Sequence, residues 1–193
     1  MIDISSYKNL PELTGVLDSH ITEPTYSTNF QIIKFPKRNF WVLSDKVEDF
    51  YDDKNNIYSV DNLNSITDYA SELLTTDFSS ILIAGLGIGI IPYMVKNHSS
   101  CSTIDVVEIN QEMIDLVKPI GYLDGVNIIN DDIFTYEPAT TYDIILLDIW
   151  NCDCYENLES EMSTLTTKYI SNLNPGGFIY IPINKNLGRV KFS

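Results

Sequence analysis

The sequence predicts an α/β protein in which a parallel sheet carries helices on both faces. From residue 79 onward, short apolar segments alternate with segments of helical periodicity. The apolar segments lack a polar face, which is typical of parallel strands buried on both sides. One of them, at 81–84, runs directly into Gly-x-Gly-x-Gly at 85–89. Glycines at this spacing let the backbone turn sharply from a strand into a helix and approach a ligand closely.

Residues 1–60 are predicted to form an N-terminal β-hairpin region. Residues 1–26 contain turn formers and two prolines, which is typical of a loose lead-in with room for one short helix. The predicted strands of this region are 29–35, 40–44 and 57–60. The first two are β-rich segments that flank a turn at 36–39, which indicates a hairpin.

Residues 61–193 are predicted to form a second domain around the parallel sheet. Asp61 caps a predicted helix over 62–74, which has apolar residues at helical spacing. The strands that follow are predicted at 81–84, 103–108, 126–129, 142–148 and 178–183. The further helices are predicted to start near 89 and to span 111–118 and 158–173, where an Asn-Pro-Gly-Gly sequence stops the last one. Right-handed crossovers restrict how these strands wind. Because the strands are parallel, their carboxyl ends share one edge, where ligands bind.

Acidic residues stand at the carboxyl ends of three predicted strands. Glu108 ends the second strand, 19 residues after Gly89, close to the spacing expected for a carboxylate that accepts ribose hydroxyls. Asp132 follows the third strand and Asp148 ends the fourth. Each acid also has a purely structural interpretation: a solvated loop for Glu108, an Asp-Asp turn for Asp132 and a loop cap for Asp148. We favour ligand binding because the three acids and the glycine loop are expected at the same edge.

Composition is typical of a soluble globular protein. The 193 residues are 44% hydrophobic and 20% charged, which suffices for one core of good size. No apolar run approaches the roughly 20 residues of a membrane span, and no signal peptide is recognised at the N-terminus. The cysteines are three, an odd number without the spacing of a disulfide framework. We therefore expect a cytoplasmic protein.

The net charge of −15 disfavours nucleic acid as a partner, because phosphate backbones repel an acidic surface. A small molecule or a cationic partner fits this charge better, although an acidic surface also occurs with no such partner. Cys152 and Cys154 lie two residues apart, but only His20 and His98 could complete a zinc site. No metal site is expected.

Five motifs in order resemble those of class I S-adenosylmethionine-dependent methyltransferases. They lie at 81–89, 106–110, 130–134, 142–148 and 173–177. The resemblance covers about residues 60–183 and implies a Rossmann-like methyltransferase fold. Within that superfamily the sequence is most similar to the spermidine-synthase-like branch, in which a β-hairpin region precedes the fold and a Tyr-Asp-apolar-Asp strand carries the catalytic acid.

The resemblance also implies a cofactor and roles for the site residues. The cofactor is S-adenosylmethionine, or its decarboxylated form in the aminopropyl-transferring branch. The residues implied to face it are Gly85, Gly87 and Gly89. Glu108 is implied to hold the ribose and Asp132 to lie beside the adenine. Asp148 is implied to stand near the reacting centre as the catalytic residue.

Two departures from the spermidine-synthase pattern decide the order of the functional alternatives. Ile88 stands where those enzymes have an acid that binds the aminopropyl amine, and Asn151 stands where they have a second acid. An isoleucine neither accepts a hydrogen bond nor pairs with an ammonium. The leading hypothesis is therefore a methyltransferase acting on a small or cationic acceptor. The alternatives are an aminopropyltransferase and a non-catalytic protein that binds the cofactor or serves in assembly.

The C-terminal strands are predicted to be shortened or missing. The common fold has two strands after the fifth, whereas residues 184–193 leave room for one short strand near 189–192. An uncovered fifth strand would present an exposed edge. We expect a partner subunit, the hairpin region or the tail to cover it, and the first possibility predicts a homo-oligomer.

Overall fold

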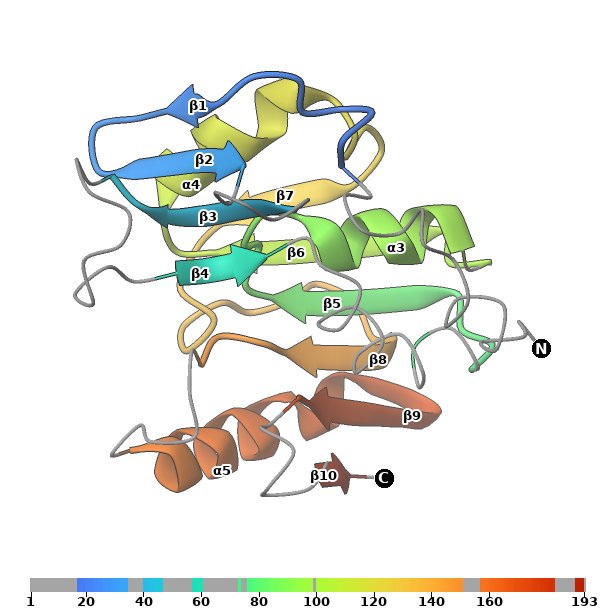
Figure 1. Cartoon of the computed structure of the whole chain (residues 1–193). Coiled ribbons are helices and arrows are strands. Elements are labelled where there is room, and N and C mark those ends of the chain that lie inside the picture. The colour runs from blue at the N-terminus through green and yellow to red at the C-terminus, as the bar shows by residue number, and fades with distance from the viewer. Residues whose placement is uncertain are drawn as a thin grey trace.

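The computed structural model contains two sheets (Figure 1). The described residues are 17–34, 40–46, 57–60, 73, 76–98, 100–150, 157–182 and 190–192. The smaller sheet has four strands in the order β1-β2-β3-β4, and the larger has six in the order β10-β9-β8-β5-β6-β7. The turn predicted at 36–39 and the helix predicted over 62–74 lie outside the described residues, apart from Leu73 in the latter.

The smaller sheet is antiparallel and confirms the predicted hairpin. Its strands are β1 (Thr25–Tyr26), β2 (Phe30–Lys34), β3 (Trp41–Asp45) and β4 (Ile57–Val60). Phe30 pairs with Asp45 and Lys34 with Trp41, so β2 and β3 are in register along their whole length. β1 was not predicted, because a two-residue strand is too short to show the alternation that marks a strand.

The larger sheet has five parallel strands and one antiparallel strand, and it confirms the predicted fold class. The parallel strands are β5 (Ser80–Ala84), β6 (Thr103–Glu108), β7 (Asn127–Asn130), β8 (Tyr142–Leu147) and β9 (Leu173–Ile181). The helices are α3 (Ile90–His98), α4 (Gln111–Val117) and α5 (Leu158–Tyr169), with 3-10 turns η2 (Lys118–Ile120) and η3 (Ile170–Asn172). The chain winds from β5 to β6 and β7 on one side and to β8 and β9 on the other, so the order reverses beside β5.

The prediction that 174–177 is a stop after a helix ending at 173 is wrong in its boundaries. α5 ends at Tyr169, η3 adds one tight turn, and β9 already begins at Leu173. Leu173 pairs with Tyr142, but the register shifts before Phe178 pairs with Ile144. The glycines thus lie in an irregular stretch of β9, where backbone pairing extends the strand beyond its apolar part.

Both faces of the larger sheet are covered, as the apolar strands predict. Ile81 and Ile83 of β5 belong to a core shared with α3 and α4. Leu82 and Ala84 alternate with them and belong to a second core shared with α5. All four side chains are fully buried. A strand buried on both faces explains why β5 reads as an unbroken apolar run.

The smaller sheet packs on the same core as α3 and α4. Ile32 of β2 and Leu43 of β3 are fully buried within that core. The backbone N–H and the side-chain amide of Asn29 donate to the two carboxylate oxygens of Glu112 on α4, at 2.7 and 2.8 Å. The domain boundary at residue 60 stays a prediction. Buried side chains from both sides of this boundary belong to one hydrophobic core.

The tail covers the edge of β9, which was one of the three expected covers. β10 (Val190–Phe192) pairs antiparallel with β9, with Val190 opposite Ile181 and Phe192 opposite Ile179. Among the described residues, it is the one strand that follows β9. The homo-oligomer stays a prediction.

Asp143 ties the start of β8 to the start of β5. Its carboxylate accepts hydrogen bonds from the Asn174 side-chain amide (2.8 Å), from the backbone N–H groups of Ser79 (2.7 Å) and Ser80 (3.1 Å), and from the Ser79 hydroxyl (2.9 Å). The Asn174 amide, followed by the Ser79 N–H, holds the pKa of Asp143 well below its ordinary value. The ionised form is therefore favoured in the folded protein.

Asp143→Asn should lower the free energy of unfolding at pH 7 by about 1 kcal/mol, because the ionised acceptor of four donors is lost at a partly exposed position. The lowered folded-state pKa means that this contribution is complete above the unfolded pKa of about 4 and disappears as the pH falls toward the folded value. Urea unfolding of both proteins at pH 7 and pH 3 measures this difference. A gap that stays the same at both pH values would contradict the assignment.

Candidate cofactor site

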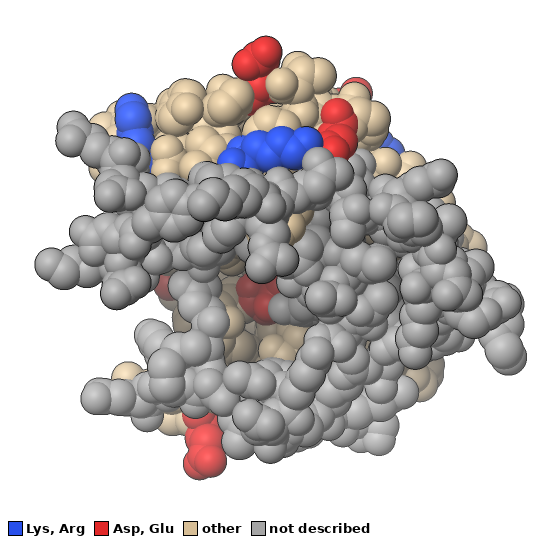
Figure 2. All heavy atoms as spheres, in the orientation of Figure 1, with Lys and Arg blue, Asp and Glu red and all other residues tan. Residues whose placement is uncertain are grey.

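The carboxyl ends of β5, β6, β7 and β8 meet along one edge of the larger sheet (Figure 1). In the same orientation, Figure 2 shows a hollow on this side of the molecule with acidic side chains on its floor. The reversal of strand order beside β5 falls at this edge. In open α/β sheets, ligands bind at this kind of position.

The glycine loop at 85–89 joins β5 to α3 in the predicted strand-turn-helix arrangement. Gly85, Gly87 and Gly89 have φ angles of 95°, 52° and 79°, in the left-handed region that favours glycine. The Gly85 N–H donates to the carbonyl of Val107 and the Gly89 N–H to that of Leu86, both at 2.9 Å. The loop conformation therefore depends on its glycines and on a hydrogen bond to β6.

The missing side chains of these glycines make room for other parts of the protein. A Cβ on Gly85 would lie 2.4 Å from the backbone oxygen of Asp148, and one on Gly87 would lie 2.8 Å from the Ser59 side chain of β4. A Cβ on Gly89 would meet Leu123 at 2.8 Å. The glycines thus allow other parts of the protein to pack closely on the loop, namely the end of β8, β4 and the turn after η2. Any contact of this loop with a ligand falls to its backbone groups.

Two backbone donors of the loop have no acceptor among the residues that the structure describes. Within the described residues, no acceptor bonds the N–H groups of Gly87 and Ile88. Both stand directly before the N-terminus of α3, where the helix dipole also favours negative charge. The loop is therefore suited to an anionic group such as a carboxylate.

Glu108 is a buried carboxylate that connects the glycine loop with α4. It is 7% exposed, and its two oxygens accept hydrogen bonds from the backbone N–H groups of Leu86 and Asn110, each at 2.9 Å. The Asn110 side chain in turn caps α4 by accepting from the N–H groups of Glu112 (3.0 Å) and Met113 (3.3 Å). Each Glu108 oxygen keeps a further lone pair, which allows it to accept a ligand hydroxyl.

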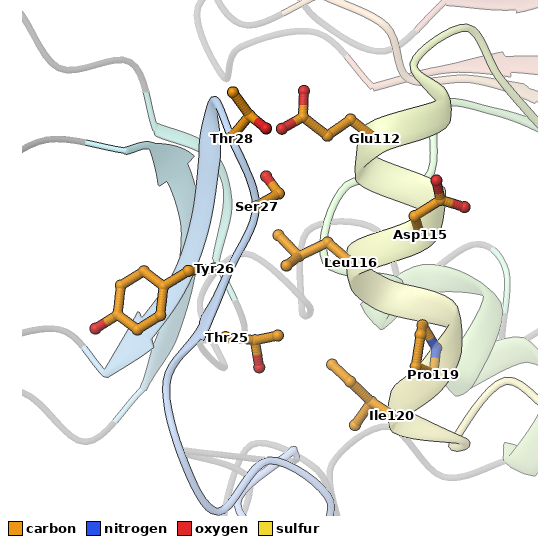
Figure 3. A pocket seen from close by; sticks show the side chains of 9 residues that line it. All are labelled: Thr25, Tyr26, Ser27, Thr28, Glu112, Asp115, Leu116, Pro119 and Ile120. Carbon is orange, nitrogen blue, oxygen red and sulfur yellow. The ribbon is translucent and has the colours of Figure 1, made fainter.

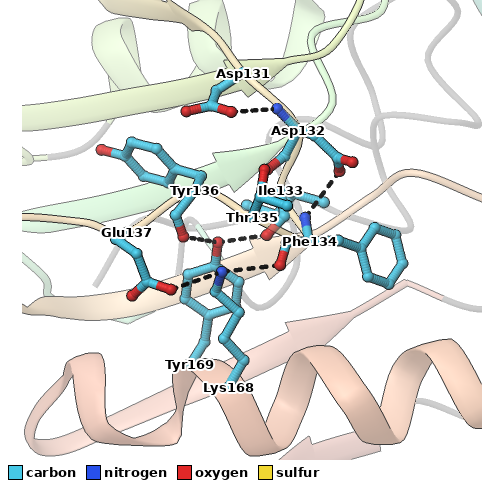
Figure 4. Close-up of polar contacts among 9 residues, drawn as sticks. All are labelled: Asp131, Asp132, Ile133, Phe134, Thr135, Tyr136, Glu137, Lys168 and Tyr169. Carbon is cyan, nitrogen blue, oxygen red and sulfur yellow. Dashed lines mark hydrogen bonds and ion pairs between the residues drawn. The ribbon is translucent and has the colours of Figure 1, made fainter.

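Asp132 lies in the 131–137 segment that follows β7 (Figure 4). One carboxylate oxygen accepts from the Phe134 N–H at 2.9 Å, and the Asp132 carbonyl accepts from the N–H groups of Thr135 (2.9 Å) and Tyr136 (2.7 Å). One oxygen of this carboxylate therefore has the turn-forming role that the structural interpretation expected. The other oxygen has no hydrogen-bond partner within the described part of the chain, so turn formation leaves it available to a ligand.

Asp148 follows β8 and is half-buried. Its N–H donates to the carbonyl of Ala84 at 3.0 Å, which places it beside the first glycine of the loop. The indole N–H of Trp150, two residues later, donates to Glu161 of α5 at 2.9 Å. Residues 151–156, including Asn151, lie outside the described residues.

The structure brings the predicted residues to one edge through direct contacts. Glu108 bonds the glycine loop, and Asp148 packs against it. The side chain of Asn130, at the end of β7, donates to the carbonyls of Glu108 and Ile109, both at 3.0 Å, and so joins the Asp132 segment to the same edge. The structure thus places all the predicted site residues around the carboxyl ends of four neighbouring strands.

Two residues at this edge were not predicted from the sequence. Ile109 is 67% exposed although it is a large apolar residue. Its exposure could have been inferred from the sequence. Ile109 directly follows the acid that ends β6, and an apolar residue beyond the end of a strand does not have to be buried. Ser59, which lies against Gly87, could not be found, because no local pattern relates β4 to a loop some thirty residues away.

Other candidate groups have structural roles. The Ile88 side chain is fully buried in the core, and Tyr93 packs against the rings of His20 and Tyr122, with centroids 5.4 and 5.9 Å away. Burial raises the pKa of Cys101 to about 11, so this thiol is protonated at neutral pH. The described residues contain no group of three side chains able to hold a metal ion, and no helix among them is long and apolar enough to span a bilayer.

A pocket of about 530 Å³ lies between β1 and α4 (Figure 3). It is lined by Thr25, Tyr26, Ser27, Thr28, Glu112, Asp115, Leu116, Pro119 and Ile120. Its two carboxylates already accept hydrogen bonds, Glu112 from Asn29 and Asp115 from Gln111 at 2.7 Å. None of the predicted site residues lines it, so it is distinct from the edge described above.

Comparisons with known proteins show the fold. No family model and no curated protein matches the sequence. Among solved structures, the chain is similar to DhpI in complex with S-adenosylhomocysteine, with 17% identity, 61% of this chain and 55% of that chain covered, and a TM-score of 0.50. It also aligns with the N-methyltransferase NodS from Bradyrhizobium japonicum WM9 (16% identity, 61% and 59% covered, TM-score 0.48). CalS10, an amino pentose methyltransferase from Micromonospora echinaspora, gives 18% identity, 63% and 50% covered, and a TM-score of 0.49.

At these identities the similarity concerns the fold alone. The larger sheet has the Rossmann-like methyltransferase fold, as predicted. The chain spans between 50% and 59% of the length of the three structures. The activity and the ligands of this chain have to be argued from its own site.

Proposed function

We propose that the protein is an S-adenosylmethionine-dependent methyltransferase acting on a small or cationic acceptor. The observation that carries the proposal is the buried Glu108 carboxylate, which bonds the glycine loop at one oxygen and the start of α4 at the other. It stands at the strand edge where this fold accommodates ligands. DhpI, which resembles this chain in fold, was crystallised with S-adenosylhomocysteine, which supports the choice of cofactor.

The chemistry of the edge fits each part of this cofactor. The Glu108 oxygens would accept the ribose hydroxyls. The open N–H groups of Gly87 and Ile88, at the N-terminus of α3, would hold the carboxylate of the amino acid portion. The exposed Ile109 side chain would offer an apolar face to the adenine. The open oxygen of Asp132 would accept a hydrogen bond from the amino group of the adenine.

The proposed reaction is a displacement at a methyl carbon. When bound, S-adenosylmethionine supplies a methyl group whose bond to sulfur breaks as the acceptor's lone pair forms the new bond, and the departing electron pair stays on sulfur. The chain contributes mainly by holding the two reactants in line, which removes the entropy of their encounter. Asp148 would hold an amine acceptor and take up the proton that it loses. The net charge of −15 favours such cationic acceptors.

Burial of Ile88 supports methyl transfer over aminopropyl transfer. Its side chain is 0% exposed and belongs to the core. This position therefore offers no acid to the amine of a decarboxylated cofactor. The homo-oligomer and the cytoplasmic location stay predictions beside this proposal.

Calorimetry tests the proposal with the full chain and three titrants: S-adenosylmethionine, S-adenosylhomocysteine and decarboxylated S-adenosylmethionine. We expect saturable binding of the first two. If none of the three binds, the cofactor proposal is wrong and a non-catalytic protein of this fold remains. Formation of spermidine from putrescine and the decarboxylated cofactor would establish the aminopropyl alternative instead.

Asp148→Asn should lower methyl transfer by about 10²- to 10⁴-fold, the usual contribution of a positioned proton acceptor. Its affinity for S-adenosylhomocysteine should stay within about twofold, since the binding residues and the backbone are unchanged. Transfer of labelled methyl from S-adenosylmethionine to a panel of small amines measures this. Asp124→Asn, at an exposed turn, is the matched control and should behave as wild type. Wild-type turnover in Asp148→Asn would remove Asp148 from the reaction.

A further inference from the structure

We propose that Lys168 and Tyr169, at the C-terminal end of α5, are positioning residues that hold the 131–137 segment in the shape that presents Asp132 to the cofactor. The consequence for cofactor binding rests on the proposed function. The tether itself rests on contacts within the chain and is tested separately.

Tyr169 joins two points of the segment. Its ring is fully buried, and its hydroxyl oxygen lies 2.7 Å from the carbonyl of Ile133 and 3.0 Å from that of Tyr136 (Figure 4). One hydroxyl hydrogen is thus shared by two carbonyls on either side of the turn. Without the hydroxyl, the Ile133 carbonyl would be left buried without this donor, a costly arrangement.

Lys168 holds the carbonyl between those two. Its ammonium nitrogen lies 2.9 Å from the Phe134 carbonyl and 3.1 Å from a carboxylate oxygen of Glu137. The Lys168 side chain is 18% exposed, whereas that of Glu137 is 81% exposed. The bond to the carbonyl is therefore the sheltered one, and the ion pair with Glu137 is the solvated one that adds little.

These contacts matter because residues 131–137 form no helix and no strand. The turn bonds of Asp132 set the local path, and the two α5 side chains fix that path against the body of the protein. The open oxygen of Asp132 can meet a ligand at no reorganisation cost only if the segment is already held in place. Loss of the tether should therefore weaken cofactor binding without removing any group that touches the cofactor.

Hydrogen exchange measured by NMR tests the tether in Tyr169→Phe and in Lys168→Met. We expect the amides of Phe134, Thr135 and Tyr136 to exchange at least about tenfold faster than in wild type. The amides of Gly85 and Gly89, which bond elsewhere, should keep their rates. Unchanged rates in the segment, or an equal rise at the two glycines, would overturn the proposal. Lys168→Met keeps the test open if Tyr169→Phe does not fold.

Calorimetry with S-adenosylhomocysteine tests the positioning role. We expect both variants to bind about 5- to 30-fold more weakly than wild type. Lys168→Arg, which can still donate to the carbonyl, should restore binding, and Glu137→Gln, which loses only the solvated ion pair, should bind within twofold of wild type. Faster exchange with wild-type affinity, or failure of Lys168→Arg to restore binding, would contradict positioning. If wild type itself does not bind, the proposed function fails while the exchange experiment still decides the tether.

Discussion

Glu108→Ala should weaken binding of S-adenosylhomocysteine by about 30- to 150-fold, which corresponds to about 2–3 kcal/mol. The substitution removes the ionised acceptor proposed for the ribose hydroxyls. It also leaves the N–H groups of Leu86 and Asn110 without their acceptor, so the glycine loop loses its link to α4. Calorimetry on folded protein, verified by circular dichroism, measures the change.

Glu112→Gln is the matched control for this experiment. Glu112 is also a glutamate bonded to backbone and side-chain N–H groups, but its partner is Asn29 of the N-terminal segment. It should bind S-adenosylhomocysteine within about twofold of wild type. Equal affinity in Glu108→Ala and wild type would remove Glu108 from the site.

Gly85→Ala should lower the free energy of unfolding by about 2–5 kcal/mol. Alanine is strained in the left-handed backbone conformation at φ 95°, and its Cβ would lie 2.4 Å from the backbone oxygen of Asp148. Because that neighbour is backbone, relief requires β5 and β8 to separate where they carry the candidate site. Urea unfolding and the thermal midpoint report the loss.

Gly121→Ala separates backbone strain from the clash. Gly121 has φ 88°, but no heavy atom lies within 4 Å of the added Cβ. It should lose only the strain, about 1–2 kcal/mol. If Gly85→Ala and Gly121→Ala lose the same amount, the tight packing of Asp148 on the loop is wrong.

The parallel sheet could be predicted because its chemistry is local. Strands such as β5 and β8 are buried on both faces and therefore read as short apolar runs. Two features of the sheets could not be predicted, for physical reasons. β1 is too short to show a pattern, and β9 extends through glycines in a stretch where its register with β8 shifts.

The positions of the candidate site residues followed from topology. Parallel strands place their carboxyl ends together, so Glu108, Asp132 and Asp148 could be assigned to one edge before any contact was known. The residues that support the site could not be assigned. Ser59 and Tyr169 reach it from distant parts of the chain, and such contacts leave no mark on local sequence.

A crystal structure of the full chain with S-adenosylhomocysteine tests whether the edge around Glu108 is the cofactor site. We expect the ribose hydroxyls within hydrogen-bond distance of the Glu108 carboxylate and the adenine between Ile109 and Asp132. A ligand bound in the pocket between β1 and α4, or a ribose away from Glu108, would contradict it.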